Sequence, residues 1–309
     1  MRPRLLSLCT GTGALDMAVG AFYGADVVAV AETDPGACKL LESRAPEVPN
    51  LGDLTQLDWS TVPECDILTA GFPCQPVSHA GKRKGTADER WIWGDIAEGL
   101  RQLRPAVAVF ENVRGLLTAN SGHAFARVLH DIHSVGIYEC RWGAVRAADA
   151  GAAHRRERIF ILCVAADAAG AERRAEEHET VGAAVGSAAE LGERHSEASA
   201  DADGSGLEGH GGSEKNGAER RQSSPEGHSP SCDWGPYAGA VRRWESVLGR
   251  RAPDPTDERG LSPWFVEWMM GFEGGFVCDA DLSRTTELRL LGNSVVAQQA
   301  LLALELLHE

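Results

Sequence analysis

A cysteine held between two prolines is the first residue in this sequence whose setting points to chemistry. Cys74 lies in the stretch GFPCQPVSHAG, residues 71–81, directly after the apolar run 67–70. Pro73 and Pro76 fix φ on both sides of it, so the loop loses little conformational freedom when it orders. A thiolate nucleophile needs such a fixed direction, whereas a buried structural cysteine does not. We therefore predict that Cys74 is a reactive thiol.

A carboxylate and two arginines are expected near this thiol. Glu111 follows the apolar run 106–110, where a carboxyl group is costly unless it is protonated or hydrogen-bonded. Arg156 and Arg158 are two residues apart where the chain enters the apolar run 159–166, and alternate residues of a strand share one face. We expect both arginines to point into the same cleft, although an exposed strand edge would show the same alternation.

A glycine-containing turn near the N-terminus is suited to a nucleoside. Gly11 and Gly13 lie where an apolar run gives way to a helical pattern. Glu32 ends the next apolar run, at about the 20-residue spacing from which a carboxylate reaches ribose hydroxyls, and Asp53 could accept a hydrogen bond from an adenine amino group. The structural alternatives are glycines of a tight turn, a glutamate that ends a strand and an aspartate of a turn.

These residues lie at the ends of short apolar runs that alternate with helical patterns. Strands are predicted at residues 4–9, 26–32, 65–72, 106–113 and 157–166, and helices at residues 14–24 and 95–103. This alternation predicts an α/β fold with a mostly parallel sheet covered on both faces, in which ligands bind at the carboxyl ends of the strands. The cysteine, the glutamate and the glycine turn should therefore meet at one edge.

The net charge of −15 is concentrated in one segment of unusual composition. Residues 167–230 contain 14 acidic and 6 basic side chains and have no aromatic residue, isoleucine or methionine. Such a stretch buries too little apolar surface to offset the entropy of ordering it. We predict a disordered insert with at most a weak helix over residues 168–191, so the acidity does not exclude a polyanionic partner for the rest of the chain.

Cysteine spacing and hydropathy argue against several other classes of protein. The eight cysteines form no C-x-x-C pair and several lie in apolar runs, so neither a metal site nor a disulfide framework is expected. The longest apolar runs fall well short of the roughly 20 residues that a membrane-spanning helix needs, and the first residues show no signal-like stretch. We expect a cytoplasmic protein with no membrane partner.

Taken in order, the motifs are similar to those of the cytosine-5 DNA methyltransferases. The series is LCTGTGALD, AETDP, GDLT, GFPCQP, ENV, HRRER and LGNSVV, which covers residues 5–160 and 282–307. The resemblance implies a Rossmann-like fold that binds S-adenosylmethionine and methylates C5 of a flipped-out cytosine in double-stranded DNA, as in restriction-modification systems. A monomer is expected.

The resemblance also implies a role for each matching residue. Cys74 would be the nucleophile that adds to C6 of cytosine, Glu111 would act as an acid at N3, and Arg158, supported by Arg156, would face the O2 side of the base. Addition of the thiolate makes C5 reactive toward a sulfonium methyl group, and the base must leave the duplex stack for this attack. The cofactor would be held by Cys9, Thr10, Gly11, Gly13, Glu32, Asp53 and Asn293.

Three positions depart from the family pattern. Cys9 stands where phenylalanine is usual and Ala14 where glycine is usual, so the cofactor pocket is expected to differ in shape. His154 stands where glutamine is usual, which puts the anchoring role of that position in doubt.

The resemblance divides the chain into four parts. Residues 1–166 would be the catalytic and cofactor-binding domain, 167–230 the insert, 231–279 a small target-recognition region, and 280–309 a segment that returns to the catalytic domain. In the third part, candidates for DNA contact are Trp234, Tyr237, Arg242 and Arg243, with Arg250 and Arg251 for phosphate, whereas Trp244 and Trp268 are expected in a core.

Other classes of function stay open at this point. An RNA cytosine methyltransferase of the same fold would share Cys74 and Glu111, and competition between duplex DNA and tRNA as methyl acceptors would distinguish the two. A relative that transfers a modified group is compatible with the altered cofactor turn. A non-catalytic DNA-binding relative should have lost Cys74, Glu111 or Arg158, and all three are present.

Overall fold

The computed structural model describes residues 1–73, 91–166 and 232–309. Cys74, the predicted insert at 167–230 and the weak helix within it lie outside the described residues. The elements before residue 167 are β1 (Arg4–Leu8), α1 (Ala14–Tyr23), β2 (Asp26–Ala31), α2 (Pro35–Arg44), β3 (Ile67–Gly71), α3 (Trp93–Leu103), β4 (Val107–Val113), α4 (His123–Ser134), β5 (Tyr138–Arg146) and β6 (Glu157–Ala165). After residue 231 follow α6 (Ala238–Leu248), β7 (Thr256–Asp257), β8 (Gly260–Leu261), α7 (Pro263–Met269), α8 (Arg284–Asn293) and α9 (Ala297–His308). Short 3-10 helices are η1 (Leu54–Gln56), η3 (Arg114–Leu117), η4 (Ala119–Gly122), η5 (Ala147–Ala150) and η8 (Gly235–Tyr237).

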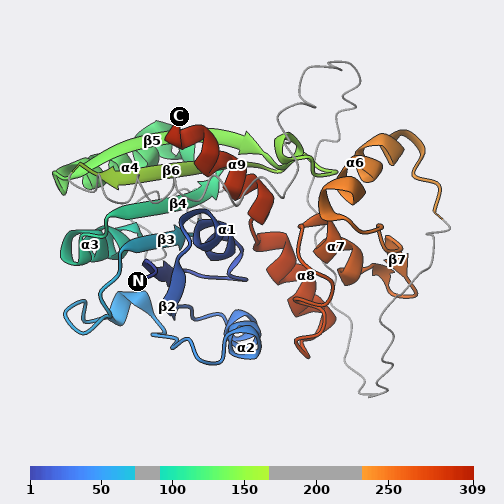
Figure 1. The fold of residues 1–309 in the computed structure, drawn as a ribbon, viewed down its shortest axis with the longest axis horizontal. Coiled ribbons are helices and arrows are strands. Elements are labelled where there is room, and N and C mark those ends of the chain that lie inside the picture. Colours follow the sequence, from blue (N-terminus) through green and yellow to red (C-terminus); the bar gives the residue numbers. More distant parts are fainter. Residues whose placement is uncertain (74–90, 167–231) are drawn as a thin grey trace.

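A six-stranded sheet forms the centre of the molecule (Figure 1). Its strand order is β2-β1-β3-β4-β6-β5; β2, β1, β3 and β4 run parallel, and β6 is antiparallel to both of its neighbours. The five predicted strands, the two predicted helices and the mostly parallel sheet are confirmed. The sequence analysis missed β5, because most of its residues are exposed at the edge of the sheet and form no apolar run.

The helices begin and end at residues suited to those positions. Helix α1 starts after Gly13 and stops at Gly24, whose φ angles of 78° and 63° lie in the left-handed region that favours glycine. At the start of α2, the Asp34 side chain accepts hydrogen bonds from the backbone N–H groups of Gly36 and Ala37. Both helices therefore begin at the same edge of the sheet, beside the carboxyl ends of β1 and β2.

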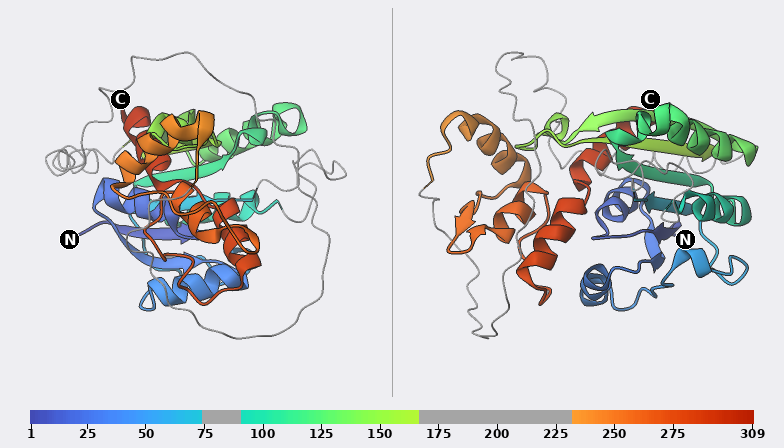
Figure 2. Two further views of the ribbon diagram at one scale, coloured as in Figure 1. Left: turned by 90° about the vertical axis from the view of Figure 1, so that its right-hand side faces the viewer. Right: turned by 180° about the vertical axis from the view of Figure 1, so that it is seen from behind.

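Alternate residues of the strands feed two cores, one on each face of the sheet. Helices α1 and α9 cover one face, and α3 and α4 cover the other (Figures 1 and 2). In β6, Phe160 and Leu162 pack on the α1 and α9 side, whereas Ile161 and Cys163 pack on the α3 and α4 side. Burial of Phe160, Ile161 or Leu162 stabilises the fold by about 1.5–3 kcal/mol each.

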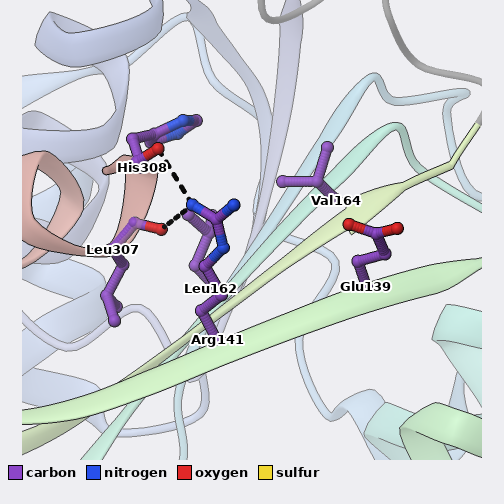
Figure 3. A pocket seen from close by; sticks show the side chains of 6 residues that line it. All are labelled: Glu139, Arg141, Leu162, Val164, Leu307 and His308. Carbon is purple, nitrogen blue, oxygen red and sulfur yellow. Dashed lines mark hydrogen bonds between the residues drawn. The ribbon is translucent and has the colours of Figure 1, made fainter.

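The C-terminal helix is held by the edge strand β5. Arg141 of β5 donates hydrogen bonds to the carbonyl groups of Leu307 and His308, both 2.9 Å long, at the end of α9 (Figure 3). These carbonyls have no partner within the helix, so the arginine satisfies them. Glu139 and Leu162 lie beside Arg141 on the same face of the sheet.

Residues 284–308 are long and apolar enough to cross a membrane by length and hydropathy alone. The helix breaks at residues 294–296, however, and α9 packs against α1 and β5. Half of the most apolar part of the segment 284–308 is buried. Packing in the core therefore accounts for the apolar composition of this segment.

The residues after 231 pack on the same core as α1 and α9. Trp244 and Trp268 are fully buried, as predicted, and Trp244 Nε1 donates to the carbonyl of Trp268 at 3.0 Å. Trp234 stacks on Phe265, while Tyr237 is exposed. Arg250 is half-buried, and its guanidinium group donates to the carbonyl of Phe272; its contact with phosphate stays a prediction.

A buried carboxylate organises the loop that follows α7. Glu267 is 1% exposed, and its two oxygens accept backbone hydrogen bonds from Gly275 at 2.7 Å, Val277 at 2.5 Å and Cys278 at 3.1 Å. A buried charge is tolerated only where such donors replace water. Glu267 therefore determines how residues 275–278 are placed.

We expect the substitution Glu267→Gln to lower the free energy of unfolding by about 3 kcal/mol, because the amide removes the charge and turns an N–H donor toward backbone N–H groups. Urea denaturation followed by fluorescence would measure this. The exposed Glu305 on α9 offers the same chemical change as a control, expected to cost less than about 0.5 kcal/mol. Equal effects of the two variants would contradict the role of Glu267.

Candidate active site

The described residues line one large cavity at the carboxyl ends of β1, β2, β3 and β4. Its volume is about 890 Å³, and its walls come from the turn after β1, the ends of β2, β3 and β4, the start of β6 and the segment after α8. The carboxyl edge of a parallel sheet is where α/β folds bind their ligands. The sequence-predicted residues of this cavity are Cys9, Thr10, Gly11, Glu32, Asp53, Glu111, Arg158 and Asn293.

The glycine turn and Glu32 form one hydrogen-bonded unit. Gly11 has a φ of 58°, and its N–H donates to Glu32 Oε2 at 2.7 Å. Glu32 Oε1 accepts from the backbone N–H groups of Thr33 and Asp34, both at 2.8 Å. A carboxylate offers about four lone-pair positions, so the backbone orients Glu32 and leaves Oε2 able to accept one further hydrogen bond.

The segment after α8 returns to the glycine turn through two contacts that the sequence analysis did not predict. Thr12 and Ser294 are both buried, and their hydroxyl oxygens lie 2.6 Å apart. Arg289 of α8 forms a double hydrogen bond with Asp34 at the start of α2, at 2.6 and 3.0 Å. These two contacts place Asn293, the last residue of α8, in the wall of the cavity.

Asp16 is a buried carboxylate beneath the glycine turn that the sequence analysis missed. Its oxygens accept hydrogen bonds from Ser7 of β1, at 2.7 Å, and Thr69 of β3. The Ser7 hydroxyl oxygen in turn lies 2.9 Å from that of Thr10, in the turn itself. Burial raises the pKa of Asp16 to about 6 despite these hydrogen bonds. The network thus connects the turn to α1, β1 and β3.

Asp53 has the turn role weighed for it, and it also lies at the cavity. Its Oδ1 accepts from the backbone N–H and the hydroxyl of Thr55, at 2.9 and 2.8 Å, and so caps η1. Asp53 also lines the cavity, with Oδ2 on the same carboxyl group. The turn geometry therefore orients the carboxylate at the cavity wall.

The two departures in the glycine turn, Cys9 and Ala14, both line the cavity. Cys9 has a φ of 53° and lines the cavity, and burial together with the charge of Glu32 raises the pKa of its thiol to about 12. Cys9 therefore stays a neutral, apolar side chain at ordinary pH. Ala14 is buried at the first position of α1, where its methyl group also lines the cavity.

A largely buried ion pair lines the cavity. Arg158 Nε and Glu111 Oε1 are 2.8 Å apart, and each side chain is only 14% exposed. Burial raises the pKa of Glu111, and the positive charges of Arg158 and Arg156 oppose that rise. The register of the sheet brings the two together: Glu111 pairs with Phe160, and Arg158 lies two residues away on the same antiparallel strand.

The expectation that both arginines point into this cleft is wrong for Arg156. It precedes β6 with a φ of 27°, and its guanidinium group donates to the carbonyls of Gly292, at 2.9 Å, and Ser294. Arg156 does not follow the alternation of the strand, so it holds the returning segment instead. His154 has a related function, since its Nε2 donates to the carbonyl of Met269 at 3.0 Å and ties this stretch to α7.

Residues 71–73, which directly precede Cys74, are held by contacts with β4 and α3. Gly71 pairs with Glu111 across β3 and β4, and Asn112 Nδ2 donates to the carbonyl of Phe72 at 3.0 Å. Phe72 is buried against Trp93, and Pro73 lines the cavity. The residue before Cys74 therefore lies at the cavity wall. Among the described residues, no group of three or more His, Cys, Asp or Glu side chains could hold a metal ion.

The sheet, the covering helices and the cavity at its carboxyl edge define a Rossmann-like methyltransferase fold. Two solved structures share it: Dnmt2 methyltransferase of S. pombe, with 16% identity and a TM-score of 0.58, and a DNMT2 mutant of Spodoptera frugiperda, with 15% identity and a TM-score of 0.60. The first alignment covers 99% of this chain and 98% of the other, and the second covers 99% and 100%. At this identity the likeness concerns the fold alone.

The chain belongs to the C-5 cytosine-specific DNA methylase family, whose sequence profile matches residues 4–302. It is 39% identical over 132 residues to the type II methyltransferase M.BsuFI of Bacillus subtilis and 35% identical over 161 residues to M.HhaI of Haemophilus parahaemolyticus. These matches cover 42% and 52% of this chain, and 32% and 48% of the relatives. The chain thus matches half or less of the length of these relatives.

We expect the stability conferred by Asp16 to depend on pH. Its pKa rises on folding from 3.8 to about 6, so its contribution is fully present below about pH 4 and is lost as the pH rises through 6. Relative to Asp16→Asn, the wild-type protein should lose about 2 kcal/mol of unfolding free energy between about pH 4.5 and about pH 7.5. Urea titrations at several pH values would measure the difference. The exposed Asp254→Asn variant is the control. If the difference in unfolding free energy between wild type and Asp16→Asn did not change with pH, burial would not perturb the Asp16 carboxyl group.

Proposed function

We propose that this protein transfers a methyl group from S-adenosylmethionine to C5 of cytosine in double-stranded DNA. The observation that carries the proposal is the buried ion pair of Glu111 and Arg158, which lies in the same cavity as the glycine turn. The family membership agrees with this activity. The cytoplasmic location and the monomeric state stay predictions.

The reaction needs a nucleophile, an acid and a positive charge next to the base. In the proposed mechanism the Cys74 thiolate forms a bond to C6 while Glu111 gives a proton to N3, which limits the negative charge on the ring. The raised pKa of Glu111 supports the role of a proton donor. Arg158 keeps this carboxyl group in one orientation and faces the O2 side of the base. Arg156 supports the site indirectly, through the carbonyls of the returning segment.

The later steps restore the enzyme. Once C5 carries the methyl group, a base would remove the C5 proton, and the bond between C6 and the Cys74 sulfur would break, which restores the thiolate. N3 would return its proton to Glu111. The cytosine must be outside the duplex stack for Cys74 to approach C6 from above the ring. The cavity of about 890 Å³ is large enough to hold a base beside a nucleoside cofactor.

The described residues fit S-adenosylmethionine. When bound, it supplies an electrophilic methyl group on a sulfonium centre. Glu32 would accept a ribose hydroxyl through the remaining position on Oε2, and Asp53 the adenine amino group through Oδ2. The remaining part of the cofactor would be enclosed by the backbone of Cys9, Thr10, Gly11 and Gly13 and by the side chain of Asn293. The acidic character of the cavity, with Asp16 beneath the turn, favours a cationic cofactor.

DNA would lie across the open side of the cavity, toward the residues after 231. We propose the four-part division of the chain stated above, with residues 231–279 as the target-recognition region. Exposed Tyr237, Arg242 and Arg243 lie on η8 and α6 in this region and stay candidates for DNA contact. Exposed Arg251 also stays a candidate for a phosphate, since its contact to Glu245 is long, at 3.7 Å.

A covalent trapping assay tests the proposed function. Duplex DNA that contains 5-fluorocytosine in varied sequence contexts is incubated with labelled S-adenosylmethionine and the folded protein. Fluorine at C5 blocks the final elimination, so the wild-type protein should form a labelled, denaturation-resistant complex, and Cys74→Ser should form none. Failure of the folded wild-type protein to form a complex in any context would refute the activity on DNA. A tRNA acceptor included as a competitor separates the RNA alternative, because it should not reduce trapping on DNA.

We expect Glu111→Gln to slow methyl transfer by a factor of about 10² to 10⁴, the range that general acid catalysis supplies. Binding of S-adenosylmethionine should stay within about threefold of wild type, because Glu111 is assigned to the base. Single-turnover assays and isothermal titration calorimetry would measure the two quantities. The exposed Glu139→Gln variant on β5 is the matched control. Equal losses in binding and in rate would assign Glu111 to the cofactor instead.

A further inference from the structure

Two cysteines face each other at the edge of the sheet. Cys140 of β5 and Cys163 of β6 are paired residues of the antiparallel ladder, and their Sγ atoms lie 3.0 Å apart. Facing residues of antiparallel strands have Cα atoms about 4.5–5.5 Å apart, which lies within the range that a disulfide bond spans. The two thiols can therefore be joined without a change of the backbone.

The two sulfur atoms differ in their access to solvent. Glu139 and Arg141 lie on the α9 side of β5 (Figure 3), so Cys140, between them, points to the opposite face. Cys163 is fully buried in the core on the α3 and α4 side, while Cys140 is exposed. A small molecule can therefore reach Cys140 directly, whereas the buried Cys163 can react only with Cys140 beside it.

The acidities of the two thiols agree with this order. The hydrogen bond with Cys163 lowers the pKa of Cys140, whereas burial raises the pKa of Cys163. Burial also raises the pKa of Cys9 and Cys65, each to about 12. Because the thiolate is the attacking species in thiol chemistry, Cys140 should react before these three cysteines.

We propose that Cys140 and Cys163 form a reversible redox site that reacts with low-molecular-weight disulfides. The Cys140 thiolate attacks one sulfur of the small disulfide, forms a mixed disulfide and releases a small thiolate. Cys163 then loses its proton and attacks Sγ of Cys140, which releases the second small thiolate. The protein gives up two electrons and the small disulfide accepts them; the two protons of the protein thiols end on the two small thiols.

The bond would close the loop that carries the two arginines of the active site. Residues 140–163 include most of β5, η5, Arg156 and Arg158. Strand β5 pairs with β6 and, within the described parts of the chain, with no other strand, so local opening of the sheet should begin there. Arg158 is five residues from Cys163, about 17 Å along the strand, so the bond should leave its contact with Glu111 unchanged.

Oxidised glutathione is a suitable probe for this site. The full-length protein is equilibrated with mixtures of oxidised and reduced glutathione, free thiols are blocked, and a tryptic digest is analysed by mass spectrometry without reduction. Cleavage after Arg127, Arg141 and Arg158 places the two cysteines in separate peptides. We expect these peptides to be recovered as one linked species, and the melting temperature of the oxidised protein to be about 5 °C higher than that of the reduced protein.

Three variants make the test specific. Cys140→Ser and Cys163→Ala should each abolish the linked peptide and make the melting temperature independent of the glutathione ratio; Cys140→Ser is at an exposed position and keeps the test valid if the buried change impairs folding. Cys232→Ser, outside the sheet, should behave like wild type. Recovery of Cys140 only as a glutathione adduct or a free thiol would overturn the proposed site. A linked peptide without the rise in melting temperature would overturn its stabilising effect.

Discussion

The cavity edge of the sheet depends on two opposite charges that can be buried only together. Glu111 and Arg158 are both largely removed from solvent, 2.8 Å apart. Loss of either partner would leave an uncompensated charge, which is far more costly than the pair itself. The pair exists because β6 enters the sheet antiparallel beside β4, so that the start of one strand meets the end of the other. A purely parallel continuation would place the arginine at the opposite edge, about a strand length away.

Hydrogen-bond donors around the cavity allow its wall to hold several carboxylates. Glu32, Asp16 and Asp53 each accept hydrogen bonds from backbone N–H groups or hydroxyl groups of the surrounding turns. These donors orient the acidic groups, but none of them adds a positive charge. A cationic cofactor would complete the electrostatics of this wall, in the same way that Arg158 completes those of Glu111.

The two ends of the sheet serve different purposes. The carboxyl edge collects the charged residues and is closed by the C-terminal segment through Ser294 and Arg289. The far part of the β5 and β6 pair contains Cys140 and Cys163, where a reversible bond would stabilise the sheet edge without approaching Glu111 and Arg158. A pair of this kind is a local redox site rather than the disulfide framework that the cysteine spacing argued against.

Five strands of the main sheet, the sheet type and eight residues of the cavity wall could be predicted from the sequence, because buried strands need apolar runs and glycine turns need particular residues at their ends. The order of motifs also sufficed to identify the family. Tertiary structure alone decided the contacts of Asp16, Thr12 and Arg156, since their partners are 53, 282 and 138 residues away in the chain, and no local pattern encodes such pairs. It also decided the edge strand β5 and the facing of Cys140 and Cys163, because strand pairing is a property of the folded sheet.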